Sequence, residues 1–113
     1  MINRAAVILK YKEPFVRWIN EADPCEDHAV ITLESANEDR NVYLITDEDG
    51  ENFEEWVSLN CKTLFENELE GWYTDKSLWP KKRNKKTFNE WFDVECHTVI
   101  IDTVGGKIED DET

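Results

Sequence analysis

Two short groups contain the residue types that bind metals. Cys25 and His28 are two residues apart, and Cys96 and His97 are adjacent. Zinc is held by thiolates and imidazoles at short spacing, usually in two clusters, so the first group fits one half of a site. Adjacent side chains on a strand point to opposite faces, so Cys96 and His97 cannot both join it. We therefore predict no metal and no cofactor, and interpret the three cysteines as free thiols.

Two other segments resemble ligand loops but lack the required residues. A calcium loop starting at Asp47 would need Gly at position 52 and Glu at 58, where the chain has Asn52 and Ser58. Residues 102–106 follow an apolar run as phosphate loops do, but no helix pattern follows to supply an N-terminus for an anion. We predict a turn with a negatively charged helix start in the first case and a strand-ending turn in the second.

The strongest candidate for a binding site combines aromatic and basic residues. Five of the 13 basic residues fall within residues 81–86, directly after an aromatic loop. Such a mixture can stack on nucleic-acid bases or hold an acidic peptide through charge and ring contacts. The alternative is that the aromatic rings fix the loop to the core while the lysines are solvated or pair with the protein's own carboxylates. The candidate partner-binding residues are Trp72, Tyr73, Trp79, Lys81, Lys82, Arg83, Lys85 and Lys86.

The overall charge limits the classes of partner. The chain of 113 residues has 26 acidic and 13 basic residues, a net charge of −13. Phosphate contacts need a basic surface, so we expect no direct nucleic-acid binding and no membrane binding. An acidic protein surface is the expected partner of the basic segment. The sequence shows no apolar run near 18 residues and no signal peptide, which predicts a cytoplasmic protein.

The elements that must position these residues are organised around a long helix over residues 51–72. Its apolar side chains recur at helical spacing and form one stripe. Asp49 and Asn52 are both plausible N-caps, and Gly71 is the expected end. The residues between the apolar ones, Glu68 among them, are expected to form the wet face. The stripe consists of Phe53, Trp56, Val57, Cys61, Leu64, Phe65, Leu69 and Trp72.

Strands are predicted at residues 5–11, 29–33, 41–46 and 94–103. Further helices are predicted at 13–22, with Pro14 in the first turn, and near 87–92, with Asn84 or Thr87 as the N-cap. The order β-α-β-β-α-(α)-β is typical of an α+β, ferredoxin-like sandwich, an antiparallel four-stranded sheet with helices on one face. Residues 1–106 are expected to form a single domain, followed by an acidic, frayed tail at 107–113.

Three stretches carry a resemblance to a known family: GWYTDKSLWP at residues 71–80, FNEWF at 88–92 and VIIDTVGG at 99–106. They are similar to small acidic bacterial proteins without an assigned activity. The resemblance spans most of the chain. It implies a bacterial cytosolic protein and assigns no catalytic residue.

No coherent catalytic set is present, which favours a non-enzymatic interaction or regulatory domain. One alternative is a small enzyme or ligand-binding fold with a pocket lined by Trp72, Trp79, Trp91 and His97. A second alternative is an acidic nucleic-acid mimic, which requires Glu54, Glu55 and Glu66 to align in an exposed ridge. The sequence leaves the oligomeric state open.

Overall fold

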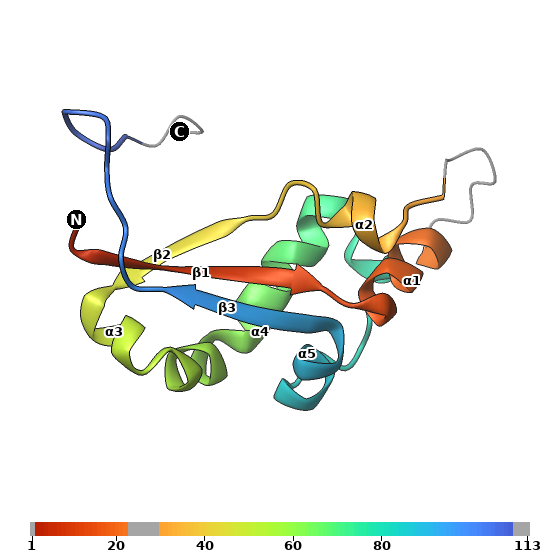
Figure 1. The fold of residues 1–113 in the computed structure, drawn as a ribbon. Coiled ribbons are helices and arrows are strands. Elements are labelled where there is room, and N and C mark those ends of the chain that lie inside the picture. Colours follow the sequence, from red (N-terminus) through yellow and green to blue (C-terminus); the bar gives the residue numbers. More distant parts are fainter. Residues whose placement is uncertain (1, 23–29, 110–113) are drawn as a thin grey trace.

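The computed structural model describes residues 2–22 and 30–109 of the chain. Helices cover one face of a three-stranded sheet, and the molecule is elongated along the strands (Figure 1). In chain order the elements are β1 (Arg4–Tyr11), α1 (Glu13–Ala22), α2 (Leu33–Ala36), β2 (Val42–Thr46), α3 (Asp47–Glu51), α4 (Phe53–Trp72), the 3-10 turn η1 (Lys76–Leu78), α5 (Lys85–Trp91) and β3 (Phe92–His97).

The first strand lies at the centre of the sheet. The strand order of the sheet is β2-β1-β3, and β1 is antiparallel to both neighbours. Alternate β1 residues, among them Ala5, Val7 and Leu9, face the helices and are at most 1% exposed. A central strand packed in this way explains why the run at 5–11 is almost entirely apolar.

The long helix is confirmed, and it lies across the inner face of the sheet (Figure 1). Phe65 and Leu69 are fully buried, and Trp56 is half-buried. Asn52 precedes the first helical residue, as expected of one of the two cap candidates, although its side chain makes no capping bond. Gly71 does not end the helix, which continues to Trp72, because no left-handed turn forms at Gly71.

The acidic run before α4 is a short helix of its own, not a turn. The Thr46 side chain caps α3 by accepting a hydrogen bond of 3.1 Å from the Asp49 backbone amide. Gly50 is buried against β1, where an added Cβ would lie 2.5 Å from the Ala5 Cβ. Close helix–strand packing therefore requires glycine at this position.

The strand predicted at 29–33 is not found; Ala29 lies outside the described residues. Thr32 and Ser35 instead form a capping box that starts α2. The Asn20 side chain bonds both the amide and the carbonyl of Ile31, each at 2.8 Å. Because a side chain satisfies these backbone groups, no neighbouring strand is required there.

The last strand is shorter than predicted. It runs from Phe92 to His97 instead of through residues 94–103. Its ladder with β1 ends at the pair Ala6–His97, and a bond of 2.8 Å from the Ile2 amide to the Ile100 carbonyl continues the contact. Beyond it, residues 101–109 are exposed and leave the body of the protein (Figure 1). The last four residues of the predicted tail lie outside the described residues.

The α+β class is therefore established with a three-stranded antiparallel sheet, whereas a four-stranded sheet in ferredoxin-like order is not confirmed. The helices at the two ends of the chain agree with the prediction: α1 has Pro14 in its first turn, and α5 has Asn84 as its N-cap. In the described part of the chain, no helix has the length and apolar character needed to cross a membrane.

Candidate interaction surface

The aromatic side chains of the predicted binding segment point into the protein. Trp79 is buried, and its indole Nε1 donates a hydrogen bond of 2.8 Å to the Tyr73 carbonyl. The Tyr73 hydroxyl donates to the Ile19 carbonyl at 2.6 Å, which ties the end of α4 to α1. The Trp72 indole donates to the Tyr11 hydroxyl at 3.3 Å. These three rings therefore fix the loop after α4 to the core.

A tight turn at residues 75–78 lies between Tyr73 and Trp79. The Asp75 carboxylate accepts hydrogen bonds from the Ser77 hydroxyl at 2.7 Å and from the Ser77 amide at 3.0 Å. Both bonds stabilise the charged carboxylate and lower the pKa of Asp75. The Trp18 indole donates to the Leu78 carbonyl at 2.9 Å, which fixes the turn to α1.

The Arg83 side chain, like the aromatic side chains, makes its contacts within the protein. Its Nη1 donates to the Pro80 carbonyl at 2.7 Å, and its Nε lies 3.7 Å from a Glu66 carboxylate oxygen. The second distance is an ion-pair contact and not a hydrogen bond, so the buried Nε proton has no acceptor among the described residues. The guanidinium also lies 5.8 Å from the Trp79 ring centre. Arg83 therefore connects the basic segment to α4.

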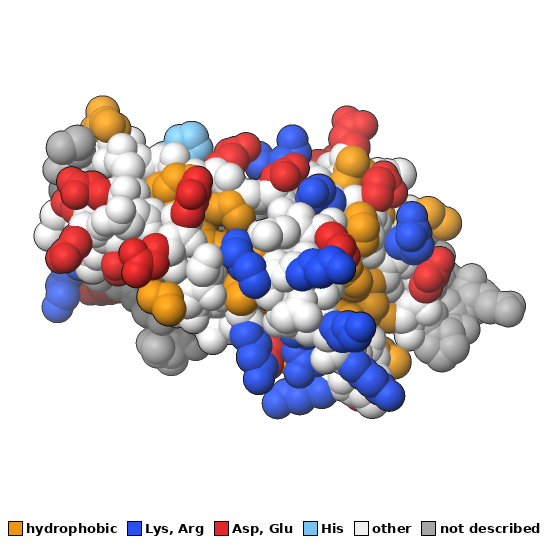
Figure 2. Space-filling model, turned by 90° about the horizontal axis from the view of Figure 1, so that it is seen from below, with side chains coloured by type: hydrophobic (Ala, Val, Ile, Leu, Met, Phe, Trp, Pro, Cys, Tyr) orange, Lys and Arg blue, Asp and Glu red, His pale blue; other side chains and the backbone are white. Residues whose placement is uncertain are grey.

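The lysines, in contrast, are available to a partner. Lys81, Lys82 and Lys86 are exposed, whereas Lys85 is half-buried and donates to the Asn89 side-chain oxygen at 2.9 Å. Ion pairs in the described part of the chain involve Arg40, Arg83 and His97, and none engages these four lysines. Figure 2 shows basic side chains gathered on one face, where α5 and the chain before it lie. We call Lys81, Lys82, Lys85 and Lys86 the lysine cluster.

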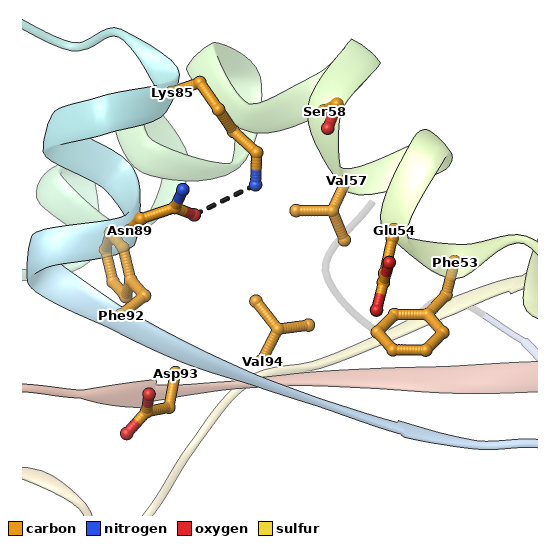
Figure 3. A pocket seen from close by; sticks show the side chains of 9 residues that line it. All are labelled: Phe53, Glu54, Val57, Ser58, Lys85, Asn89, Phe92, Asp93 and Val94. Atoms are coloured by element: carbon orange, nitrogen blue, oxygen red, sulfur yellow. Dashed lines mark hydrogen bonds between the residues drawn. The ribbon is translucent and has the colours of Figure 1, made fainter.

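A cleft of about 510 Å³ adjoins the lysine cluster, between α4, α5 and β3. Val57, Phe92 and Val94 form its apolar part, and Lys85 points into it from α5 (Figure 3). Its wall also carries carboxylates, Glu54 from α4 and Asp93 from β3. The cleft is therefore suited to an apolar side chain of a partner whose acidic groups lie on the α5 side. The complete lining is Phe53, Glu54, Val57, Ser58, Lys85, Asn89, Phe92, Asp93 and Val94.

One group of acidic residues lies at the far end of the molecule. The exposed acids of α3 and of the first turn of α4 lie at the end of the molecule opposite α1 (Figures 1 and 2). Glu66 does not extend this group, because it is half-buried and contacts Arg83. The ridge through Glu54, Glu55 and Glu66 that a nucleic-acid mimic requires is therefore interrupted.

The structure does not bring Trp91 and His97 together. Trp91 packs inside, with its ring centre 5.3 Å from that of Phe65 and 5.7 Å from that of Phe15. His97 is exposed on the outer face of the sheet, where its Nε2 lies 3.5 Å from a Glu95 carboxylate oxygen. The tryptophan-lined pocket containing His97 therefore loses its geometric basis.

The residues of metal-binding type are only partly described. Cys25 and His28 lie outside the described residues. Cys96 faces the core, where burial raises the pKa of its thiol, and His97 faces the opposite way, as expected of strand neighbours. Within residues 2–22 and 30–109, no group of three or more histidine, cysteine or acidic side chains is placed to hold a metal ion.

Glu68 is a buried carboxylate that was not predicted from the sequence. This residue was expected on the wet face of the long helix, but it is 1% exposed. The Tyr11 hydroxyl donates to Glu68 Oε1 at 2.6 Å, and the Asn41 side-chain amide donates to Oε2 at 2.9 Å. The Tyr43 hydroxyl also donates to Oε2. Three neutral donors thus replace the water that a buried carboxylate would otherwise need.

The same network changes the acidity of both tyrosines. Burial comes first, followed by the hydrogen bond to Glu68 and its negative charge, and together they raise the pKa of Tyr11 and of Tyr43. A signal for this site existed in the sequence, since position 68 is four residues after Leu64 and three after Phe65. That spacing places it on the buried stripe despite its charge.

Comparison of the chain with models of protein families, with curated proteins and with solved structures found no match. The resemblance to small acidic bacterial proteins therefore stays a prediction, and the inferences on function that follow depend on the geometry alone.

Proposed function

We propose that the protein is a non-enzymatic interaction domain whose lysine cluster and adjoining cleft bind an acidic segment of a partner protein. The observation that carries the proposal is that four lysines, without a carboxylate partner among the described residues, stand beside a cleft with apolar and polar walls on a chain of net charge −13. Charge complementarity of this kind selects a partner and speeds its association. We place this domain in the bacterial cytosol and infer that it binds no nucleic acid.

The aromatic residues take an indirect part in this function. The rings of Trp72 and Trp79 hold the loop, and the loop presents the lysines at the start of α5. Lys85 is held against the Phe88 ring at 5.4 Å and bonded to Asn89, so its charge has a fixed position at the cleft. We infer that Lys81, Lys82 and Lys86 supply attraction and that Lys85 supplies orientation.

The expected ferredoxin-like arrangement also enters as an inference. A central β1, antiparallel to β2 on one side and to β3 on the other, corresponds to the middle of a split βαβ sheet. The fourth strand would then be an edge strand, and its absence changes neither the lysine cluster nor the cleft.

Binding of a fluorescent glutamate-rich peptide that contains one aromatic residue tests the proposal. Fluorescence anisotropy should show saturable binding that weakens as salt is added, because salt screens exposed charges. The triple variant Lys81→Glu, Lys82→Glu, Lys86→Glu should lose this binding.

A matched control has the same net charge but leaves the lysine cluster intact. Lys10, Lys62 and Lys107 are exposed and lie on β1, on α4 and near the C-terminus, and their triple replacement by Glu should retain most of the affinity. Equal losses in the two variants, or tighter binding of a single-stranded oligonucleotide than of the peptide, would contradict the proposal.

A further inference from the structure

The two edges of the sheet differ in charge. Asp93 and Glu95 are exposed on β3, and charged side chains keep an edge strand from pairing with another strand. The other edge, β2, has the sequence VYLIT, with neither a charged residue nor a proline. In the described part of the chain, β2 makes backbone hydrogen bonds to β1 and to no segment on its other side. Of the two edges, β2 is the unprotected one.

An uncharged groove runs beside this open edge. A hollow of about 440 Å³ lies between β2 and α4, and a second hollow shares Val42, Tyr43 and Asn67 with it and continues to Glu70. None of the residues of the first hollow is charged, although 35% of the residues in the chain are. These residues are Val42, Tyr43, Leu44, Trp56, Asn60, Thr63, Leu64 and Asn67. We call them the β2–α4 seam.

The helical wall of the seam is a regular stripe. Trp56, Asn60, Thr63 and Asn67 follow one another at steps of four, three and four residues, which places them on one side of α4. Leu59, which is 77% exposed, borders this stripe. On the strand, Val42 and Leu44 are 56% and 50% exposed. The centre of an interface is typically rich in aromatic residues and poor in charged ones, and the seam contains Tyr43 and Trp56 and no charged residue.

We propose that the β2–α4 seam binds the same seam of a second copy of this chain, with the two β2 strands pairing antiparallel. Two chains of charge −13 repel each other, which favours a self-contact that brings no acidic side chains together, and the residues of the seam are uncharged. A twofold contact joins identical patches, so both sides are then uncharged.

The geometry of strand pairing restricts the register. Directly opposed residues of antiparallel strands lie on the same face, so Val42 and Leu44 of one copy face Val42, Leu44 or Thr46 of the second copy on the outer side of a six-stranded sheet. Specific interfaces bury at least about 1,200 Å² in total, more than five paired residues supply, so the α4 stripe is a necessary part of the contact.

Sedimentation of the full chain over a range of concentrations tests this dimer. The protein should reach twice its mass of 13.3 kDa, and added salt should tighten the dimer, because it screens the repulsion between the two acidic chains. Leu44→Lys and Thr63→Arg should each raise the dissociation constant at least about thirtyfold, as expected for a central contact. His97→Lys is the control, because it places the same charge on the outer face of β3 at the opposite edge.

The two variants act on different elements, so a folding defect in one leaves the other informative; circular dichroism identifies such a defect. A wild-type protein that stays monomeric at every concentration overturns the proposal. It is also overturned by a dimer that survives both Leu44→Lys and Thr63→Arg. A dimer that is lost only on deletion of the exposed residues 101–109 overturns it in the same way. Acidic-peptide binding uses another surface, so either result leaves the function proposed for the lysine cluster standing.

Discussion

The segment from Trp72 to Lys86 has an aromatic half and a basic half that differ in what their side chains contact. Trp72, Tyr73 and Trp79 donate their polar hydrogens to acceptors inside the protein. Lys81 and Lys82 extend into solvent a few residues later. The aromatic residues thus stabilise the fold, whereas the lysines that follow them in the sequence are the residues proposed to bind a partner. Mutations in the two halves should therefore affect different measured quantities.

The largest expected effect is on stability in the aromatic half. Trp79→Ala removes a buried ring and the hydrogen bond to Tyr73, and should lower the free energy of unfolding by about 4 kcal/mol. Urea denaturation measures the change. Trp79→Phe keeps most of the apolar contact and should lose clearly less. A loss below about 1 kcal/mol for Trp79→Ala would show that the ring does not hold the loop.

The next effect concerns a buried acid in a chain whose acids are otherwise mostly exposed. Glu68→Ala removes the acceptor of Tyr11, Tyr43 and Asn41, and should lower the free energy of unfolding by about 3 kcal/mol, because buried donors are left without partners. Glu70→Ala on the exposed side of the same helix should change it by less than about 0.5 kcal/mol. Equal effects of the two substitutions would contradict the network.

The pH dependence follows from the same network and should be smaller. Because the pKa values of Tyr11 and Tyr43 are raised in the folded protein, the folded state holds these protons more tightly than the unfolded chain. Their contribution to stability is complete below about pH 10, the ordinary tyrosine pKa, and is lost as the pH rises further. Urea titrations at increasing alkaline pH should show this fall, with a shallower slope for Tyr43→Phe. Parallel slopes for both proteins would count against it.

The smallest effect on stability is expected in the basic half. Replacing Lys81, Lys82 and Lys86 by Glu removes no hydrogen bond or ion pair recorded for these side chains, so each change should cost less than about 0.5 kcal/mol. Urea denaturation of the triple variant, compared with Trp79→Ala, makes the contrast between the halves quantitative. A loss as large as that of Trp79→Ala would mean that the lysines contribute to folding.

Patterns with strong periodicity were predicted correctly from the sequence. The apolar stripe of α4, the apolar strand β1 and the Asn84 cap of α5 each depend on local spacing, and the structure contains all three. The errors occur where side chains satisfy the backbone. Asn20 bonds the amide and carbonyl of Ile31 in place of a fourth strand, which apolar content alone could not reveal.

The candidate site was predicted in part. The basic run was recognised from its charge, but whether the rings of Trp72 and Trp79 face a partner or the core depends on acceptors distant in sequence, such as Tyr11. Glu68 was assigned by its charge to the wet face, although its position on the buried stripe indicated otherwise. Its carboxylate is stabilised by hydrogen bonds from two tyrosines that are 57 and 25 residues away in the sequence, so only the tertiary fold brings these groups together.

An NMR titration that maps peptide binding onto individual residues tests most directly whether the lysines bind the peptide while the aromatic rings serve the fold. In a ¹⁵N-labelled sample titrated with the glutamate-rich peptide, the backbone amides of residues 81–89 should shift, whereas the indole signals of Trp72 and Trp79 should hardly move. Large shifts of those two indole signals with unchanged amides at 81–89 would contradict the account.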